Sequence, residues 1–206
     1  MKVSVSFIKS KYNERETIRF IDQTNADYLH VDVMDGKFVT EKNYTFGQIK
    51  EYVKETSKKL DVHLMCENPH KYIKDFALLN TEYLIFHLET VNNPEEIINE
   101  IHSYGIKCGI SIKPDTEVIK LKPYLEKIEQ VLVMSVEPGA GGQEFMPEMI
   151  QKIDDLKTLG LTNFLISVDG GINESTIDYV RNADMVVSGS FVCLSDNYQE
   201  QINKLR

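Results

Sequence analysis

The chain has 206 residues, of which 42% are hydrophobic and 27% are charged, a composition typical of one globular domain with a sizeable core. Its 32 acidic residues outnumber its 23 basic residues and give a net charge of −9, which argues against nucleic acid or an anionic membrane surface as a partner. The first residues lack the apolar centre of a secretory signal, and no stretch approaches the roughly 20 apolar residues of a membrane span, so we expect a cytoplasmic protein.

Short apolar runs alternate with amphipathic stretches along the whole chain. Eight runs have the length and composition of buried strands, at 3–8, 27–33, 60–65, 82–88, 107–112, 130–136, 164–168 and 185–188. Helical patterns follow them at 14–24, 46–57, 70–79, 94–104, 117–126, 147–159, 174–181 and 197–204. Strict alternation predicts a parallel sheet with right-handed crossovers. Eight units favour an α/β fold of one domain, residues 1–206, closed into a (β/α)8 TIM barrel rather than an open sheet.

Polar residues at the ends of three of these runs point toward the inside of the predicted barrel. Active sites of such barrels form where the C-terminal ends of the strands meet the following loops. Successive side chains of a strand alternate between its two faces, and the apolar face suits packing against helices. The opposite, inward face then carries His30, Asp32, Met34, Asp61, His63, Met65, Ser167 and Asp169.

Two histidines and two carboxylates of this set converge: His30, Asp32, His63 and Asp169. Burying several ionisable groups is costly unless a cation neutralises them, so the cluster predicts a site for one divalent metal ion. Imidazole and carboxylate ligands together suit zinc, iron, manganese or cobalt. Each residue taken alone is more often a hydrogen-bonded structural group, and we interpret His87, also near a strand end, in that way.

Glycine-rich turns follow the last three runs, at Pro138-Gly139-Ala140-Gly141-Gly142, Gly170-Gly171 and Gly189-Ser190. Because glycine has no Cβ, such turns can bring backbone N–H groups close to an anion, and barrels commonly hold phosphate after strands seven and eight. The turns therefore predict a phosphate ester site in spite of the acidic composition. Met34, Met65 and Met134 at inward strand ends are core filling or, beside the metal cluster, a water-poor wall around a reacting centre.

Together these segments resemble the ribulose-phosphate 3-epimerase family. The resemblance begins with HVDVMDG at 30–36, followed by Phe38-Val39, and with DVHLM at 61–65. It continues with VMSVEPG at 133–139, which runs on to Phe145 as a phosphate loop, and with VDGGI at 168–172 and SGS at 188–190. The match spans nearly the whole chain in the right order.

The resemblance implies a ribulose-phosphate-binding barrel that interconverts D-ribulose 5-phosphate and D-xylulose 5-phosphate in the pentose phosphate pathway. It implies that the metal is held by the cluster of four, that Asp32 removes the C3 proton to form an enediolate, and that Asp169 delivers a proton to the other face. It also suggests a homo-oligomer. The substrate contacts it implies are Ser6, Met34, His63, Met65, Met134, Gly139, Ala140, Gly141, Gly142, Gly170, Gly171, Gly189 and Ser190.

Three departures from the family pattern leave the substrate open. Thr40-Glu41 replaces a usual Pro-Asn, Ala140 a usual Phe, and Lys113 a usual Asn. A sister epimerase for a six-carbon ketose such as D-allulose 6-phosphate is therefore an alternative. Decarboxylases and aldol-type synthases on similar barrels carry Asp-x-Lys-x-x-Asp, but Met34 stands where that lysine would be. A catalytically silent sugar-phosphate-binding barrel would have lost a ligand or a carboxylate, and none is missing.

Overall fold

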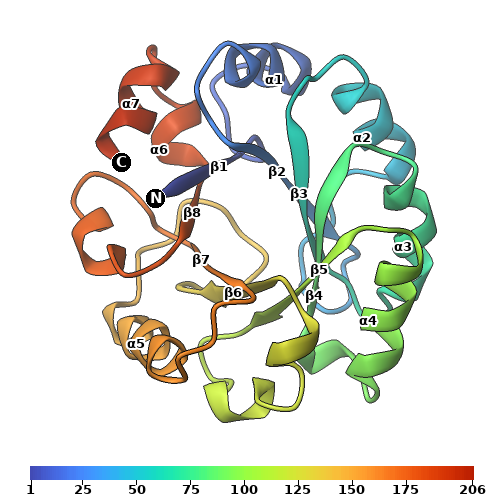
Figure 1. The fold of residues 1–206 in the computed structure, drawn as a ribbon. Helices are drawn as coiled ribbons and strands as arrows, with labels where there is room; N and C mark the ends of the chain where they lie inside the picture. The colour runs from blue at the N-terminus through green and yellow to red at the C-terminus, as the bar shows by residue number, and fades with distance from the viewer.

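The computed structural model describes residues 1–206, and its centre is a closed barrel of parallel strands. Each strand pairs with its sequence neighbours and β8 pairs with β1, so the sheet has no free edge (Figure 1). The expected (β/α)8 TIM barrel is confirmed. The strands are β1 Lys2–Ser6, β2 Tyr28–Met34, β3 Lys59–Met65, β4 Thr81–His87, β5 Lys107–Ile112, β6 Gln130–Met134, β7 Leu165–Asp169 and β8 Met185–Ser188.

Helices surround the barrel and form its outer layer (Figure 1). The α-helices are α1 Glu14–Asp22, α2 Phe46–Val53, α3 His70–Ala77, α4 Pro94–Ser103, α5 Ile150–Thr158, α6 Ser190–Cys193 and α7 Tyr198–Lys204. Short 3-10 helices are η1 Leu88–Thr90, η2 Val118–Leu121, η3 Leu125–Lys127, η4 Pro147–Met149 and η5 Ile177–Val180.

Local sequence signals explain where several helices begin. The Asn13 side chain accepts a hydrogen bond from the Glu16 N–H at the start of α1. Thr45 and Gln48 form a capping box at the start of α2. Pro94 occupies the first turn of α4, where its missing N–H costs nothing.

Two of the expected α-helices are wrong. The stretch 117–126 forms only the 3-10 turns η2 and η3, because Pro123 lies in its middle and cannot donate a helical hydrogen bond. The stretch 174–181 forms only η5, and it includes the β-branched residues Thr176, Ile177 and Val180, which lower helix propensity. Helix α6, just four residues long, was not expected at all.

The hydrophobic core has two main parts, on the two sides of the sheet, and a third cluster of only Met34, Val39 and Met65. The outward strand residues, such as Leu29, Val31 and Val33, pack with helix residues such as Ile18 and Ile49. A smaller group fills the barrel itself and comprises Tyr28, Tyr83, Ile85, Leu132, Met134, Val136, Met185 and Val187. The inward and outward faces of the strands thus follow the predicted alternation.

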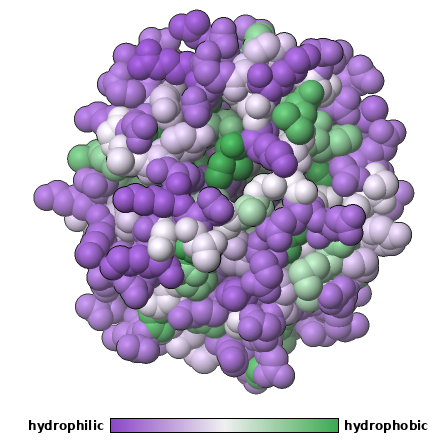
Figure 2. Space-filling view, turned by 180° about the vertical axis from the view of Figure 1, so that it is seen from behind, coloured by the Kyte–Doolittle hydropathy of each residue, from purple (hydrophilic) through white to green (hydrophobic).

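The surface seen from behind the view of Figure 1 is mainly hydrophilic, and its hydrophobic residues form small separate groups (Figure 2). None of the helices combines the length and the apolar character that crossing a membrane requires.

Candidate active site

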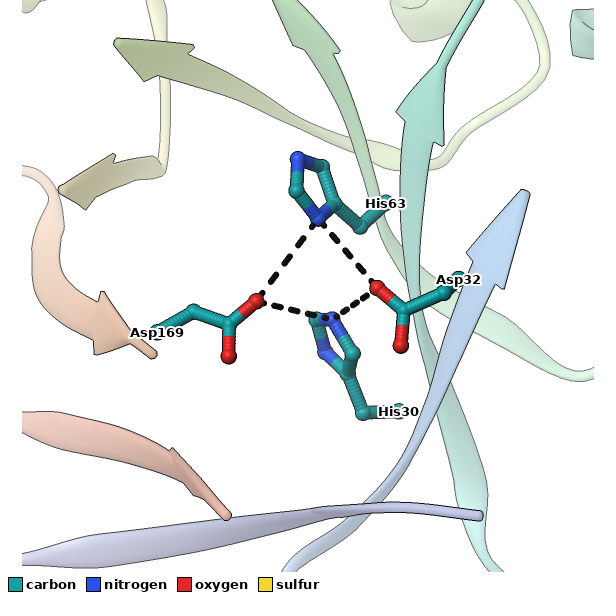
Figure 3. A group of neighbouring side chains, drawn as sticks. All are labelled: His30, Asp32, His63 and Asp169. Atoms are coloured by element: carbon teal, nitrogen blue, oxygen red, sulfur yellow. Dashed lines mark ion pairs between the residues drawn. The ribbon is translucent and has the colours of Figure 1, made fainter. Parts of the chain in front are cut away.

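The four residues of the predicted metal cluster meet at one point inside the barrel. His30 and Asp32 come from β2, His63 from β3 and Asp169 from the last position of β7. Asp32 lies directly opposite His63 in the β2–β3 register, which brings their side chains together. One ligand atom from each of the four residues lies within 4.8 Å of all the others (Figure 3).

The distances within this cluster fit a divalent cation. Asp32 Oδ1 lies 3.4 Å from His30 Nε2 and 3.5 Å from His63 Nδ1, and Asp169 Oδ2 lies 3.9 Å from each of these nitrogens. Tetrahedral coordination with bonds of about 2.0–2.2 Å separates neighbouring ligand atoms by about 3.3–3.6 Å. The two distances from Asp32 match this separation, and the two from Asp169 are slightly longer. Both nitrogens are buried and have no hydrogen-bond partner in the protein. Such atoms are unusual without a ligand, so the donor set suits a metal.

The other nitrogen of His30 is held by a carboxylate that the sequence did not single out. His30 Nδ1 lies 2.7 Å from Asp61 Oδ2, and Asp61 also accepts hydrogen bonds from Ser4 Oγ at 2.9 Å and Gln130 Nε2 at 3.3 Å. A carboxylate at this position orients the imidazole and presents Nε2 as the ligand atom. Alternation along β3 placed Asp61 inside the barrel, but only the cross-strand register shows that it reaches His30.

The other nitrogen of His63 leads into a second buried chain of contacts. His63 Nε2 lies 2.9 Å from His87 Nε2, and His87 Nδ1 lies 3.0 Å from Glu89 Oε2. Burial lowers the pKa of His87 to about 4 despite its contact with Glu89. Burial alone would raise the pKa of Glu89, but hydrogen bonds from His87, Thr116 and the Lys113 N–H lower it to about 2. His87 is thus a neutral structural group that holds His63.

Asp32 and Asp169 differ in their readiness to carry a proton. Burial alone would raise the pKa of Asp32, but His30 and His63 hold it well below its ordinary value, and Ser6 Oγ lies 2.8 Å from its Oδ2. Burial raises the pKa of Asp169 to about 6, and the Asp32 charge adds to this while His30 opposes it. One carboxyl therefore favours the ionised form and the other holds a proton more readily.

A cavity opens over the cluster at the C-terminal ends of the strands. Six of the residues that line it are the last residues of their strands, namely Ser6, Met34, Met65, Met134, Asp169 and Ser188. The loops that follow these strands supply most of the rest.

All but one of the expected substrate contacts line this cavity. The exception is His63, which is fully buried and does not reach the cavity wall. Other residues that line the cavity were not predicted as substrate contacts. Each of them lies at or near a strand end or a glycine-rich turn, and this position was the signal that could have identified them. They are Ile8, Lys9, Val136, Glu137, Pro138, Gln143, Ile172, Val187 and Ser188.

The turn after β7 can only be built from glycine. Gly170 and Gly171 have φ angles of 123° and 65°, which other residues rarely adopt. A Cβ would lie 2.6 Å from Val136 Cγ2 at the first position and 2.5 Å from Phe145 N at the second. Ser135 Oγ fastens the turn by donating to the Gly170 carbonyl at 2.7 Å. The chain after β6 and the turn after β7 are thereby packed together at the mouth of the cavity.

Only one of the departures from the family pattern lines the cavity, and it is Ala140. Lys113 is outside the lining and forms an ion pair with Glu137, with 3.2 Å between Nζ and Oε2. Thr40 and Glu41 are exposed and also lie outside it. Residue 140 is therefore the only one of these positions at which the departure can change the space available to a substrate.

Comparisons with known proteins match the chain to a single enzyme family. The profile described as the ribulose-phosphate 3 epimerase family matches residues 2–193. The chain is 38% identical over 201 residues to ribulose-phosphate 3-epimerase of Schizosaccharomyces pombe, covering 94% of this chain and 86% of that protein. It is also 38% identical to the cytoplasmic isoform of this enzyme from Oryza sativa subsp. japonica, covering 100% and 92%.

Among solved structures, the tryptophan synthase subunit alpha from Campylobacter jejuni has a similar fold. The TM-score is 0.69, and the match covers 100% of this chain and 95% of that one at 16% sequence identity. At this identity the likeness concerns the barrel fold only.

Proposed function

Since the chain belongs to the ribulose-phosphate 3-epimerase family and is therefore an isomerase, we propose that it interconverts D-ribulose 5-phosphate and D-xylulose 5-phosphate by proton transfer at C3, as a step of the pentose phosphate pathway. The observation that carries this proposal is the pair of carboxylates, Asp32 and Asp169, that face each other across the cluster (Figure 3). Inverting a carbon requires two groups, because a single group would return the proton to the face it came from.

The family resemblance and the positions of the two carboxyls support their assignment. Asp32 is the base that removes the C3 proton, and Asp169, on the other side of the cluster, is the acid that supplies a proton to the opposite face. Ser6 holds Asp32 Oδ2 and leaves Oδ1 directed at the cluster. In the reverse direction the two residues exchange roles, since each has changed its protonation state.

His30, Asp32, His63 and Asp169 would hold a single divalent cation, for which zinc, iron, manganese and cobalt are all suitable. A bound cation would supply Lewis-acid stabilisation of the negative charge that develops on the ketone and hydroxyl oxygens of the enediolate. Asp61 and His87 orient the two imidazoles and keep their ligand nitrogens directed into the cluster.

The remaining lining residues bind the rest of the substrate. The phosphate lies against the backbone of the three glycine-rich turns, Gly139–Gly142, Gly170–Gly171 and Gly189–Ser190, which surround one side of the cavity. Met34, Met65 and Met134 form an apolar wall beside Asp32 and Asp169 and limit the access of water to the reacting carbon.

A six-carbon ketose phosphate is the second candidate substrate, and the observation that favours it is Ala140 in the cavity lining. A small side chain at this position leaves more room over the substrate than the phenylalanine usual in the family. The catalytic residues are the same for both substrates.

The experiment compares turnover of D-ribulose 5-phosphate and D-allulose 6-phosphate by protein purified without chelators, with metal content measured by elemental analysis. In deuterium oxide the protein should also exchange the C3 proton of its substrate with solvent. A larger kcat/KM for the five-carbon ketose supports the proposal, and a larger value for the six-carbon ketose selects the second candidate. If the metal-loaded protein exchanges neither C3 proton, the chain is a binding protein and the proposal fails.

A further inference from the structure

The cavity lining offers little positive charge to an anionic substrate. Asp32 and Asp169 belong to the proposed metal site, Glu137 is paired with Lys113, and Lys9 is the only lysine or arginine among the lining residues. A sugar phosphate carries a charge of about −1.5 to −2 near neutral pH, and the chain itself has a net charge of −9. Backbone N–H dipoles orient a phosphate, but they carry no net charge to balance that of the phosphate.

Lys9 lies beside the turn that follows β6. It is the third residue after the end of β1, and its side chain crosses the backbone of Gly141 and Gly142. A Cβ placed on Gly141 would be 3.5 Å from Lys9 Cβ, and one placed on Gly142 would be 2.5 Å from Lys9 Nζ. The ammonium group is therefore directly over the glycine-rich turn.

The ammonium group of Lys9 is not committed to another charge. Its one hydrogen bond within the protein is a long one, of 3.5 Å, to the Gly141 carbonyl oxygen. No carboxylate lies within ion-pair distance of it, whereas Lys11, two residues later, pairs with Asp196. The Lys9 side chain is exposed to solvent at the rim. It is thus free to pair with an anion without breaking an existing ion pair.

We propose that Lys9 is a phosphate-binding residue, which pairs its ammonium group with the substrate phosphate at the Gly141–Gly142 turn and so favours phosphorylated over unphosphorylated ketoses. The choice of a sugar phosphate as ligand rests on the proposed function. Because the phosphate does not take part in the proton transfer, this contact stabilises the bound substrate and the transition state equally. Lys9 therefore acts on KM and on the association rate and leaves kcat nearly unchanged.

The test compares Lys9→Met, which keeps most of the aliphatic length, with Lys9→Arg, which keeps the charge. Lys11→Met is the matched control, since it removes the same charge two residues away and outside the cavity lining. Binding of inorganic phosphate is measured by calorimetric titration of each purified protein at low ionic strength. We expect Lys9→Met to weaken phosphate binding about tenfold, the size of one hydrogen bond to a charged group. Lys9→Arg should retain most of the affinity, and Lys11→Met should leave it unchanged.

Steady-state kinetics give the second measurement. Lys9→Met should raise KM for the ketose phosphate by a similar factor with kcat nearly unchanged, and the difference from wild type should shrink with added salt. Equal thermal unfolding midpoints of wild type and Lys9→Met would show that the effect is not one of folding. Unchanged phosphate affinity in Lys9→Met, or a fall in kcat at constant KM, overturns the proposal.

The phosphate titration does not depend on turnover. If wild type binds phosphate but converts neither ketose phosphate, the proposed function fails, and the loss of phosphate affinity in Lys9→Met still supports the role of Lys9. If wild type epimerises its substrate and Lys9→Met binds phosphate equally well, the proposed function stands and the inference about Lys9 is wrong.

Discussion

Each imidazole in the cluster has one nitrogen held by the protein and one directed at the common centre. Asp61 holds Nδ1 of His30, and His87 holds Nε2 of His63. The two rings therefore present different nitrogens, Nε2 and Nδ1, to the same centre. Since a partner at one nitrogen sets the tautomer, the supporting residues decide which nitrogen is free to bind a cation.

The two catalytic carboxylates give a prediction at the residue scale. Asp169→Asn should lower kcat for epimerisation by about 10²- to 10⁴-fold, the usual contribution of a positioned acid or base. It should still exchange the C3 proton of D-ribulose 5-phosphate slowly with solvent, because Asp32 remains to remove it. Asp32→Asn should lose both epimerisation and this exchange. A coupled assay measures turnover, and mass spectrometry in deuterium oxide measures the exchange.

Asp178→Asn serves as the control for these variants, because the Asp178 side chain is 83% exposed and is not part of the cavity lining. Full epimerase activity in either active-site variant would remove that residue from the mechanism. Loss of the C3 exchange in Asp169→Asn, with retention in Asp32→Asn, would reverse the two assignments.

At the scale of the elements, the ends of the strands and the turns that follow them make up the site. The strand framework puts His30, Asp32 and His63 in position, and the glycine-rich turns form one wall of the cavity above them. The turn after β7 packs against both Val136 and Phe145 of the segment after β6. These two turns are therefore in close contact.

Gly171 gives a prediction at this scale, with Gly160 as its matched control. Their φ angles are 65° and 67°, but a Cβ at residue 160 would meet nothing within 4 Å, whereas one at residue 171 would lie 2.5 Å from Phe145 N. Gly160→Ala should lower the free energy of unfolding by about 1 kcal/mol, the cost of the left-handed backbone alone. Gly171→Ala should cost about 3 kcal/mol or more, because the backbone must also move. Urea denaturation measures both, and equal costs would show that the turn yields without strain.

At the scale of the whole molecule, closure of the barrel joins the two ends of the chain. Strand β8 pairs with β1, and Arg206 near the end of α7 forms an ion pair with Asp27 of 2.8 Å, just before β2. The N- and C-termini lie near each other on one side of the barrel (Figure 1). Side chains from strands β2, β3 and β7 can meet at one centre only because the sheet closes. The homo-oligomer expected from the family resemblance stays a prediction.

Acid stability gives a prediction for the molecule as a whole. The pKa of Glu89 is about 2 in the folded protein against an ordinary value of 4.5, so its ionised form stabilises the fold above pH 4.5. This stabilisation, at most about 3 kcal/mol, is lost as the pH falls from 4.5 toward 2, because the unfolded chain binds the proton first. We therefore expect Glu89→Gln to be less stable than wild type at pH 7 and to lose less stability on acidification.

Urea denaturation at pH 7, 5 and 3.5 measures this difference, with the exposed Glu126→Gln as a control. The lowered pKa of His87 adds a loss between pH 6.5 and 4, and Glu89→Gln extends this loss to lower pH because it removes the contact that raises the pKa of His87. Parallel stability curves for wild type and Glu89→Gln below pH 5 would contradict the prediction.

A structural feature could be predicted from the sequence where it depends on residues close together in the chain. The strand period of two and the apolar outward face were enough to place His30, Asp32, His63 and Asp169 inside the barrel, because the direction of a side chain follows from its own strand. The helix at 117–126 was wrongly predicted from its apolar spacing, because Pro123 within it prevents a continuous helix.

What the sequence by itself determined is therefore the order of the strands and of most of the helices, the inward face of each strand and the glycine positions of the turns, all of which follow from interactions between near neighbours in the chain. Only the tertiary structure decided that Asp61 reaches His30, that His87 supports His63 and that Lys9 lies over Gly141 and Gly142. These contacts join residues that are at least 24 positions apart, and Lys9 and Gly141 are 132 apart. They depend on the register between strands and on closure of the barrel, which no local pattern specifies.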